Sequence, residues 1–314
     1  MTLTSHETQR ISPSGLSFAV ASYVLWGAMP IVFLSLKESG AIEIVAWRIV
    51  LSLVFCAAIL LVTRRYARVM AIIRDRRTFW SLGLAGALVL INWLIYVYAS
   101  LNGHIVEASL GYFTNPIVTV LLGVVILRER LRPLQWVALA ISAFAVLILA
   151  IGYGSFPWIA LGLAFSFGFY GLVKKGVGPK ADAVGGLAVE TAFLTPVALV
   201  VLLVLAAQGQ IAAGTAGPGH LTLTLFLGAI TAIPLILFAA AARRLPLTYM
   251  GLAQYLAPIL QLIFGVFIFH EAMPPERWMG FAIVWVALAV LTFDLFRHSS
   301  RTRLGSPAEA PGAP

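Results

Sequence analysis

Residues 110–141, LGYFTNPIVTVLLGVVILRERLRPLQWVALAI, align without a gap with residues 252–283, LAQYLAPILQLIFGVFIFHEAMPPERWMGFAI, at an offset of 142 positions. In so hydrophobic a chain, apolar matches carry little weight, so the identities that count are those of uncommon residue types. These identities pair Pro116 with Pro258, Gly123 with Gly265, Glu129 with Glu271, Pro133 with Pro275 and Trp136 with Trp278. The chain therefore contains an internal repeat.

The repeat extends towards the start of each half. The same offset places Gly86 on Gly228 and Asn92 opposite Pro234, while an offset of 144 relates the beginnings of the halves. That second offset pairs Pro13 with Pro157, Ser22 with Ser166 and Gly27 with Gly171. We therefore expect two repeats, over 16–151 and 157–296.

The composition indicates a membrane protein, because only 11% of the 314 residues are charged and 61% are hydrophobic, whereas soluble domains carry about 25% charged residues. A helix needs about 20 apolar residues to cross the ~30 Å hydrocarbon core. Ten segments meet that need: 16–36, 42–63, 79–100, 106–127, 134–151, 157–173, 184–206, 221–242, 248–269 and 278–296. We expect residues 1–15 to form a cytoplasmic N-terminal segment and 297–314 a disordered cytoplasmic tail.

The positive charges fix an orientation for these ten helices. With both termini in the cytoplasm, 18 of the 21 Lys and Arg residues fall on the cytoplasmic side, as the positive-inside rule requires. Lys37 and Arg277 fall outside, and Arg48 lies within a span. The net charge of +9 is spread over short loops and not gathered on one face, which argues against nucleic-acid binding.

Each repeat has five predicted helices, and five is odd, so the second repeat must enter the membrane from the opposite side. Glu129 then lies in a cytoplasmic loop and its mate Glu271 in an external one. Inverted repeats allow a site at the midplane to open to the two sides in turn. The alternative is an old duplication with no bearing on mechanism.

Proline residues interrupt equivalent helices of the two repeats. Pro116 and Pro258 each remove a backbone hydrogen bond and predict a helix kink. Interruptions at corresponding positions of two repeats point to a binding site, although proline is also generally more frequent in membrane helices.

Polar and aromatic residues recur at helical spacing on several spans. They either hold helices together or meet a ligand, and their presence on five spans favours a ligand. The candidate substrate-binding residues of this kind are Tyr23, Trp26, Asn92, Trp93, Tyr96, Tyr112, Asn115, Tyr170, Gln254 and Tyr255.

Two charged residues lie inside spans and complete the candidate site. Arg48 and Glu190 each fall about 9 Å into a helix, but the helices enter from opposite sides, so about 12 Å of depth separates the two side chains in a ~30 Å core. A direct salt bridge is not expected. Two readings remain open: each side chain extends to its nearer interface, or the two recognise opposite ends of a zwitterion.

Several kinds of chemistry have no residues to perform them. The first and sixth spans lack Asp and Glu, so a small-multidrug-pump scheme has no carboxylate there. Metal, nucleotide and nucleophile motifs are absent from the sequence, so we expect no cofactor, no metal and no enzymatic activity. The single cysteine, Cys56, excludes a disulfide within the chain. Such short loops also leave no domain for a sensor.

Three segments resemble a known family: residues 107–116, EASLGYFTNP, residues 92–94, NWL, and residues 160–175, ALGLAFSFGFYGLVKK. They are similar to RarD proteins, in the EamA branch of the drug/metabolite transporter superfamily, and the resemblance covers about 16–296. It implies a ten-helix fold of two EamA repeats with a central substrate cavity in the bacterial inner membrane. The family is often labelled a chloramphenicol-sensitivity permease, and related YddG-type carriers export aromatic and neutral amino acids. Arg128 departs from the glycine expected before Glu129.

Together these features predict a secondary carrier that exports small metabolites, first of all neutral and aromatic amino acids. The alternative is efflux of chloramphenicol-like drugs. The expected partners are a small-molecule substrate and the lipid bilayer, with no nucleic acid and no obligate protein partner.

Overall fold

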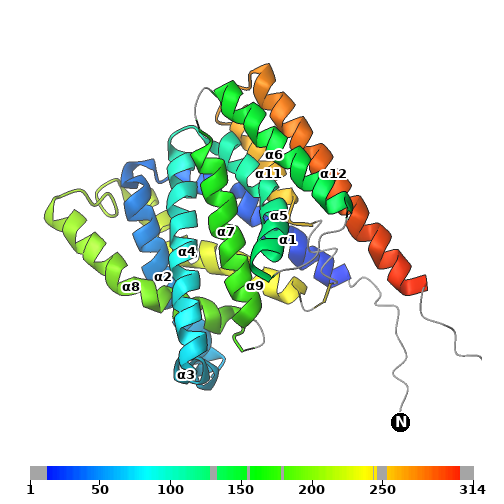
Figure 1. The fold of residues 1–314 in the computed structure, drawn as a ribbon. Coiled ribbons are helices and arrows are strands. Elements are labelled where there is room, and N and C mark those ends of the chain that lie inside the picture. Colours follow the sequence, from blue (N-terminus) through cyan, green and yellow to red (C-terminus); the bar gives the residue numbers. More distant parts are fainter. Residues whose placement is uncertain are drawn as a thin grey trace, which may run out of the picture. The chain divides into compact units, whose positions relative to one another are not determined.

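A computed structural model describes residues 13–127, 133–153, 156–177, 180–242, 244–245 and 253–304. Among these residues the secondary structure is helical throughout (Figure 1). The first-repeat helices are α1 (Pro13–Leu34), α2 (Gly40–Val62), α3 (Tyr66–Arg74), α4 (Arg76–Leu101), α5 (Ile105–Leu127) and α6 (Pro133–Tyr153), with a 3₁₀ turn, η1, at Lys37–Ser39. The second-repeat helices are α7 (Trp158–Val177), α8 (Ala183–Ala207), α9 (Pro218–Ala242), α11 (Leu256–Phe267) and α12 (Pro275–Leu304).

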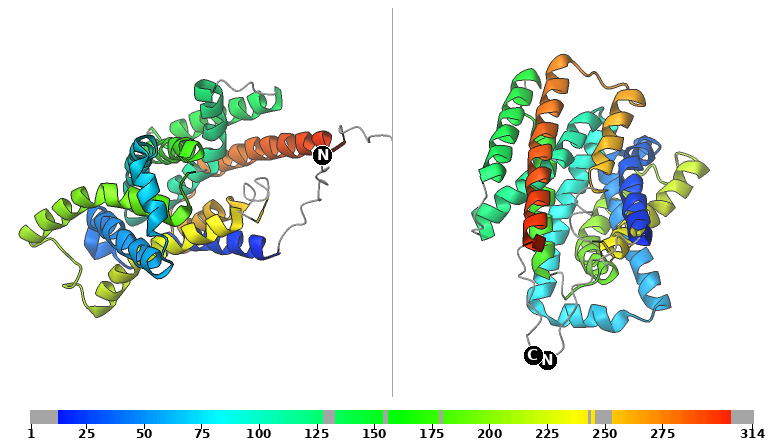
Figure 2. Two further views of the ribbon diagram at one scale, coloured as in Figure 1. Left: turned by 90° about the horizontal axis from the view of Figure 1, so that it is seen from below. Right: turned by 90° about the vertical axis from the view of Figure 1, so that its right-hand side faces the viewer.

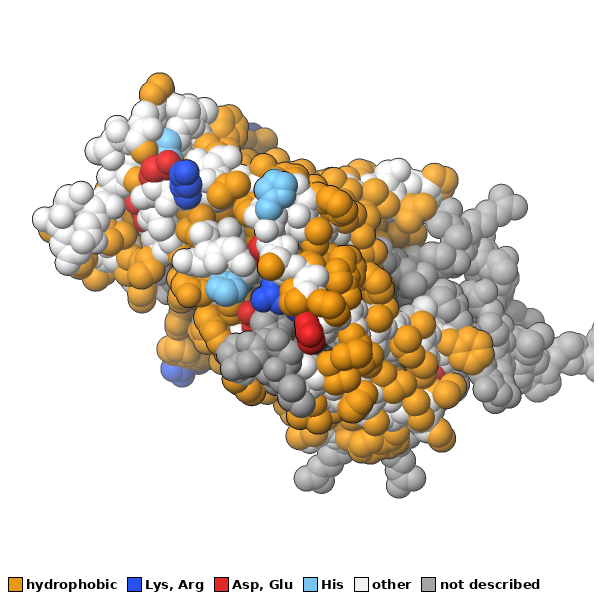
Figure 3. All heavy atoms as spheres, turned by 90° about the horizontal axis from the view of Figure 1, so that it is seen from above, with side chains coloured by type: hydrophobic (Ala, Val, Ile, Leu, Met, Phe, Trp, Pro, Cys, Tyr) orange, Lys and Arg blue, Asp and Glu red, His pale blue; other side chains and the backbone are white. Residues whose placement is uncertain are grey.

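Most of these helices have the length and apolar surface of membrane-spanning helices. Within the described residues, 7 segments are long and apolar enough to cross a membrane, and α6, α7 and α11 contain shorter apolar helices. Large apolar side chains such as Val62, Leu203 and Phe267 are largely exposed on the protein. Figure 3, which looks down on the top of Figure 1, shows hydrophobic side chains over most of the visible surface, with few charged ones among them. A surface of this kind is stable against hydrocarbon and not against water.

The helices overlap the ten segments predicted from hydropathy, with three differences. The segment predicted at 248–269 contains the shorter helix α11, and residues 248–252 lie outside the described residues. Residues 66–74, expected to be part of a basic loop, form the helix α3, which is amphipathic and therefore invisible to a search for apolar runs. The C-terminal helix α12 continues to Leu304, so residues 297–304 are helical and not part of a disordered tail. The helix continues past the apolar stretch because helix formation does not require apolar side chains. Residues 1–12, 128–132 and 305–314 lie outside the described residues.

The chain divides into two compact units, described separately here. Residues 116–157 and 273–314 form the smaller unit, in which α6 and α12 lie side by side (Figure 2). Residues 1–115 and 158–272 form the larger unit. In the larger unit α2 packs against α8 and α9, α1 packs against α9 and α11, and α4 packs against α7 and α8. Helices of the first repeat are thus interleaved with helices of the second.

Residues that the repeat makes equivalent occupy corresponding interfaces in the larger unit. Gly86 on α4 lies so close to α8 that an added Cβ would be 3.1 Å from the carbonyl oxygen of Glu190. A Cβ added to its mate, Gly228 on α9, would overlap the backbone carbonyl of Leu51 on α2.

Polar contacts in the larger unit also correspond between the two repeats. The hydroxyl of Ser22 donates to the carbonyl oxygen of Pro234 at 2.8 Å, while the amide of Asn92 donates to the hydroxyl of Ser166 at 3.0 Å. Since Ser22 pairs with Ser166 in the repeat and Asn92 with Pro234, the two contacts are counterparts.

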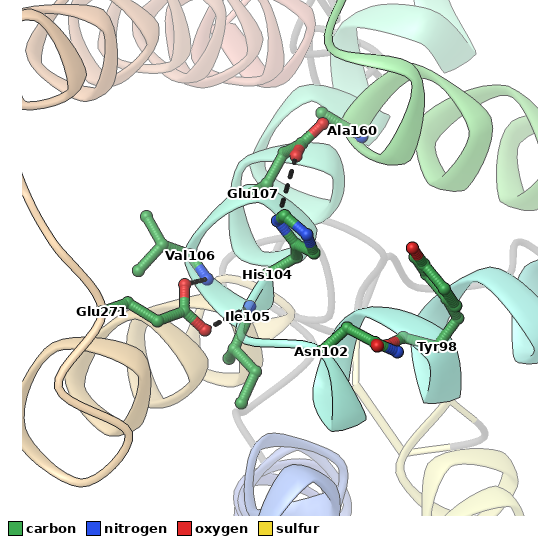
Figure 4. Close-up of polar contacts among 8 residues, drawn as sticks. All are labelled: Tyr98, Asn102, His104, Ile105, Val106, Glu107, Ala160 and Glu271. Carbon is green, nitrogen blue, oxygen red and sulfur yellow. Dashed lines mark hydrogen bonds and ion pairs between the residues drawn. The ribbon is translucent and has the colours of Figure 1, made fainter. Parts of the chain in front are cut away.

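The start of α5 is held by a carboxylate from the second repeat. Glu271 accepts the backbone N–H groups of Ile105 and Val106, the latter at 2.9 Å (Figure 4). The first N–H groups of a helix have no partner within the helix, and a negative charge there also complements the helix dipole. In the same first turn, Glu107 accepts the backbone N–H of Ala160 at 3.5 Å and lies 3.9 Å from the ring of His104. Two carboxylates therefore tie the start of α5 to its neighbours.

Replacing Glu271 by alanine should lower the free energy of unfolding by about 1–3 kcal/mol, because two buried N–H donors lose a charged acceptor. The measurement is thermal unfolding of the purified protein, followed by the reactivity of Cys56, which is buried and is the only cysteine. Glu38→Ala provides the control, since Glu38 is exposed in the 3₁₀ turn. Equal melting temperatures for the two variants would contradict the capping role.

A second interaction between the two repeats lies outside the spans, at the end of α4 far from the start of α5. Asp75 caps α4 by accepting from the backbone N–H and the hydroxyl of Thr78, and it also accepts from Lys180 at 2.7 Å. The hydrogen bond from Lys180, followed by those from Thr78, lowers the pKa of Asp75 to about 2. The carboxylate therefore stays ionised throughout the physiological pH range.

Candidate functional site

Arg48 is buried within α2 and held mainly by aromatic rings. Only 4% of the residue is exposed, and it lies eight residues after Gly40, about 12 Å along the helix. Its guanidinium carbon is 4.2 Å from the ring centre of Trp93 on α4 and 5.3 Å from that of Phe33 on α1. The Nε–H donates to the hydroxyl of Thr231 on α9 at 3.0 Å. Four helices thus fix the position of this cation.

Aromatic and amide groups continue from this cation into α5 and α7. The ring of Tyr96 lies 5.9 Å from that of Phe33 and 5.5 Å from that of Tyr112, both edge-on. The hydroxyl of Tyr112 donates to the amide oxygen of Asn92 at 3.0 Å. The Asn92 amide nitrogen in turn donates to Ser166, so the hydrogen bonds of Asn92 fix the orientation of Tyr112.

Glu190 is the other charged residue of the candidate site, and only 1% of it is exposed. Lys174 on α7 forms an ion pair with it at 2.6 Å, and the hydroxyl of Tyr170 donates to its other oxygen at 3.3 Å. Because both oxygens have partners, the carboxylate is stable in the interior.

A row of rings joins the surroundings of the two charges. The ring of Phe167 lies 6.1 Å from Tyr112 and 5.8 Å from Tyr170, which contacts Glu190. We call this row, made up of Phe33, Tyr96, Tyr112, Phe167 and Tyr170, the aromatic row. It runs from Arg48 to Glu190 through α1, α4, α5 and α7, entirely within the larger unit. An apolar row with a buried charge at either end matches the chemistry of a small amphipathic molecule.

The remaining sequence candidates lie elsewhere in the larger unit. Tyr23 and Trp26 on α1 form a separate aromatic group with Phe238 on α9, with ring centres 5.4–6.2 Å apart. Tyr255 stacks on Phe113 at 6.4 Å, and Gln254 precedes it with its side chain half-buried. Trp26 also packs against the buried cluster that contains Phe33 and Tyr96 of the aromatic row.

The proline candidates and Asn115 lie near helix contacts. Pro258 is buried on α11, and its carbonyl oxygen accepts the hydroxyl of Ser109 at 2.8 Å. Pro116 lies inside α5, immediately after the buried Asn115. Pro116 therefore lies within α5, and Pro258 lies in the first turn of α11.

Several members of the site escaped sequence analysis. Lys174, which is not among the candidates from the sequence, pairs with Glu190, and its position one turn after Tyr170 is the signal that could have identified it. Phe33, Phe167 and Thr231 gave no signal, because single apolar or hydroxyl residues are common in membrane helices. Within the described part of the chain, the ion-pair partner of Glu190 is Lys174 and not Arg48.

The described residues include no group of three His, Cys, Asp or Glu side chains that could hold a metal ion. The groups present offer charge, hydrogen bonds and aromatic faces. Such groups bind and orient a molecule.

Comparison with known proteins gives a consistent result. The model of the EamA-like transporter family matches residues 13–151 and 156–293. A RarD protein of Streptomyces exfoliatus is 47% identical over 95% of this chain and 94% of its own length. An uncharacterized transporter of Pseudomonas aeruginosa is 41% identical over 91% of this chain and 96% of its own. A solved structure at 18% identity covers 93% of this chain and 99% of its own with a TM-score of 0.57, which is a likeness of fold.

Proposed function

Since the chain belongs to the EamA-like transporter family and is a RarD-type transporter of the bacterial inner membrane, we propose that it exports neutral and aromatic amino acids. The observation that carries this proposal is the aromatic row with the buried Arg48 at one end and the buried Glu190 at the other. Rings recognise the side chain of such a substrate, and the two charges suit its carboxylate and its ammonium group.

The proposal includes a topology of ten spans in two inverted repeats, with both termini in the cytoplasm. The distribution of Lys and Arg supports this orientation. The counterpart contacts of Gly86 and Gly228, and of Ser22 and Asn92, support a symmetric relation between the repeats. An inverted pair of repeats can open one site to each side of the membrane in turn.

In this scheme the substrate is bound among helices of both repeats. Arg48 and Trp93 come from the first repeat, and Tyr170 and Glu190 from the second. Movement of one repeat against the other then changes which side can reach the site. Tyr23, Trp26, Asn115, Gln254 and Tyr255 remain candidates for contact with the substrate at other stages of that movement.

The test is efflux of labelled phenylalanine, threonine and methionine from proteoliposomes. Wild-type protein should accelerate the efflux of at least one of them, and Arg48→Ala and Glu190→Ala should each reduce that rate at least about tenfold, the equivalent of one lost charged contact. Arg65→Gln is the matched control, because Arg65 is exposed between α2 and α3.

Chloramphenicol serves as a second substrate in the same vesicles. Efflux of chloramphenicol together with indifference to all three amino acids would replace the amino-acid proposal by drug efflux.

A further inference from the structure

We propose that Arg48, together with the phenol of Tyr96, forms a subsite for one carboxylate of the substrate, so that the transported molecules carry a carboxylate next to an apolar group. This inference rests on the proposed function and specifies its chemistry. It assigns the two ends of the site different roles and excludes substrates that lack an anionic group.

The first argument is the incomplete pairing of the guanidinium. Its Nε–H is bonded to Thr231, but Nη1 is buried and has no hydrogen-bond partner among the described residues. No acidic side chain in those residues forms an ion pair with Arg48 either. A buried charge without a counter-charge costs several kcal/mol, and such residues in spans mark binding or ion pathways. An anionic ligand would supply the missing partner.

The second argument is that Nη1 of Arg48 is not the only buried polar atom without a partner in this part of the described structure. The hydroxyl of Tyr96 is buried without a hydrogen-bond partner, and so is that of Ser52, one turn after Arg48 on α2. Tyr96 and Arg48 both contact the ring of Phe33. Buried hydrogen-bond donors usually have partners, so several unpartnered donors around one cation indicate a place prepared for an acceptor.

The third argument concerns which anion fits. Glu190 already has Lys174 and Tyr170 as partners, so Arg48 contributes one unbalanced positive charge. One negative charge balances it, and a carboxylate matches the planar geometry of a guanidinium. The surrounding rings of Phe33, Trp93 and Tyr96 favour a ligand whose remainder is apolar. A doubly charged phosphate would leave one charge unpaired.

Binding requires a change of conformation. The Nη1 atom is buried between α1 and α4 in this structure, so a carboxylate reaches it only after side chains such as Trp93 and Phe33 move aside. Transport by alternating access includes such rearrangements.

The experiment compares ligands that differ by one group, using thermal unfolding of the full-length purified protein. The probes are phenylalanine, 3-phenylpropionate, which keeps only the carboxylate, and phenethylamine, which keeps only the amine. Phenylalanine and 3-phenylpropionate should raise the melting temperature of wild-type protein more than phenethylamine does, because a ligand that binds the folded state stabilises it and phenethylamine lacks the carboxylate. In Arg48→Gln the affinity for 3-phenylpropionate should fall at least about 30-fold. Arg48→Lys should retain part of the affinity, and the exposed-site variant Arg65→Gln all of it.

Tyr96→Phe keeps the ring and removes only the hydroxyl, so it tests the subsite even where Arg48→Gln fails to fold. We expect its affinity for 3-phenylpropionate to fall about 3- to 10-fold. Equal stabilisation by phenethylamine and 3-phenylpropionate, no stabilisation by either carboxylate, or unchanged affinity in both variants would overturn the inference. Phenylalanine efflux with unchanged affinity in the variants would overturn the carboxylate subsite alone. Binding of 3-phenylpropionate through Arg48 without efflux of any amino acid would overturn only the amino-acid function.

Discussion

Gly228→Ala should yield a protein that unfolds at a much lower temperature than wild type, or that fails to accumulate in the membrane. A Cβ at this position of α9 would overlap the backbone carbonyl of Leu51 on α2. Helix backbone cannot change conformation to avoid a clash as a side chain can, so α9 and α2 would have to move apart. The expected loss is about 3 kcal/mol of unfolding free energy, at the upper end for an overpacked interface. The measurement is thermal unfolding followed by the reactivity of Cys56.

Gly219→Ala is the matched control for this substitution. Gly219 lies on the same helix, and a Cβ there would have nothing within 4 Å. In a helix, alanine is also intrinsically favoured over glycine by about 1 kcal/mol, so this variant should be as stable as wild type or more so. If both variants unfolded at the same temperature, the close approach of α2 and α9 would be wrong.

Lys174→Met should strongly destabilise the protein, because it leaves the buried carboxylate of Glu190 without its counter-charge. Breaking a buried ion pair on one side costs about 3–5 kcal/mol, and we expect about 3 kcal/mol because the Lys174 side chain is 28% exposed. The double variant Lys174→Met with Glu190→Gln removes both charges, and it should recover most of the lost stability. Thermal unfolding of the two single variants and the double variant measures this coupling.

An exposed ion pair provides the comparison. Lys180 and Asp75 are similarly close, at 2.7 Å, but their side chains are 60% and 35% exposed. Exposed pairs contribute little because water and salt screen them, so Lys180→Met should change the melting temperature only slightly. A double variant no more stable than Lys174→Met would show that Lys174 stabilises the fold by some means other than its pairing with Glu190.

The fold was largely predictable because hydropathy, charge and the repeat are properties of long segments. The boundaries of α6, expected at 134–151 and found at Pro133–Tyr153, illustrate this. The predictions that failed concern short or amphipathic segments. The helix α3 has no apolar run, and residues 297–304 extend α12 with polar residues. In both cases backbone hydrogen bonding forms a helix that a search for membrane spans does not detect.

The site was predictable only in part because it depends on which side chains meet. Arg48 and Glu190 stood out as charges in apolar segments, and their separation followed from helix geometry. Their partners did not stand out. Thr231 and Phe33 are ordinary residues whose role is visible only once α9 and α1 pack against α2 and Arg48. Conversely, Tyr23 shares the composition of the aromatic row but belongs to another buried cluster, with Trp26 packed against both.

The central claim, that the two repeats cross the membrane in opposite senses, is tested most directly by cysteine accessibility at equivalent positions between predicted spans. Arg68 on α3 and Gln210 after α8 are 142 positions apart, and both are exposed. In a Cys56→Ser background, a membrane-impermeant maleimide should label Gln210→Cys in intact bacteria and Arg68→Cys only after permeabilisation. Labelling of both positions from the same side would contradict the inverted repeat and the alternating site proposed from it.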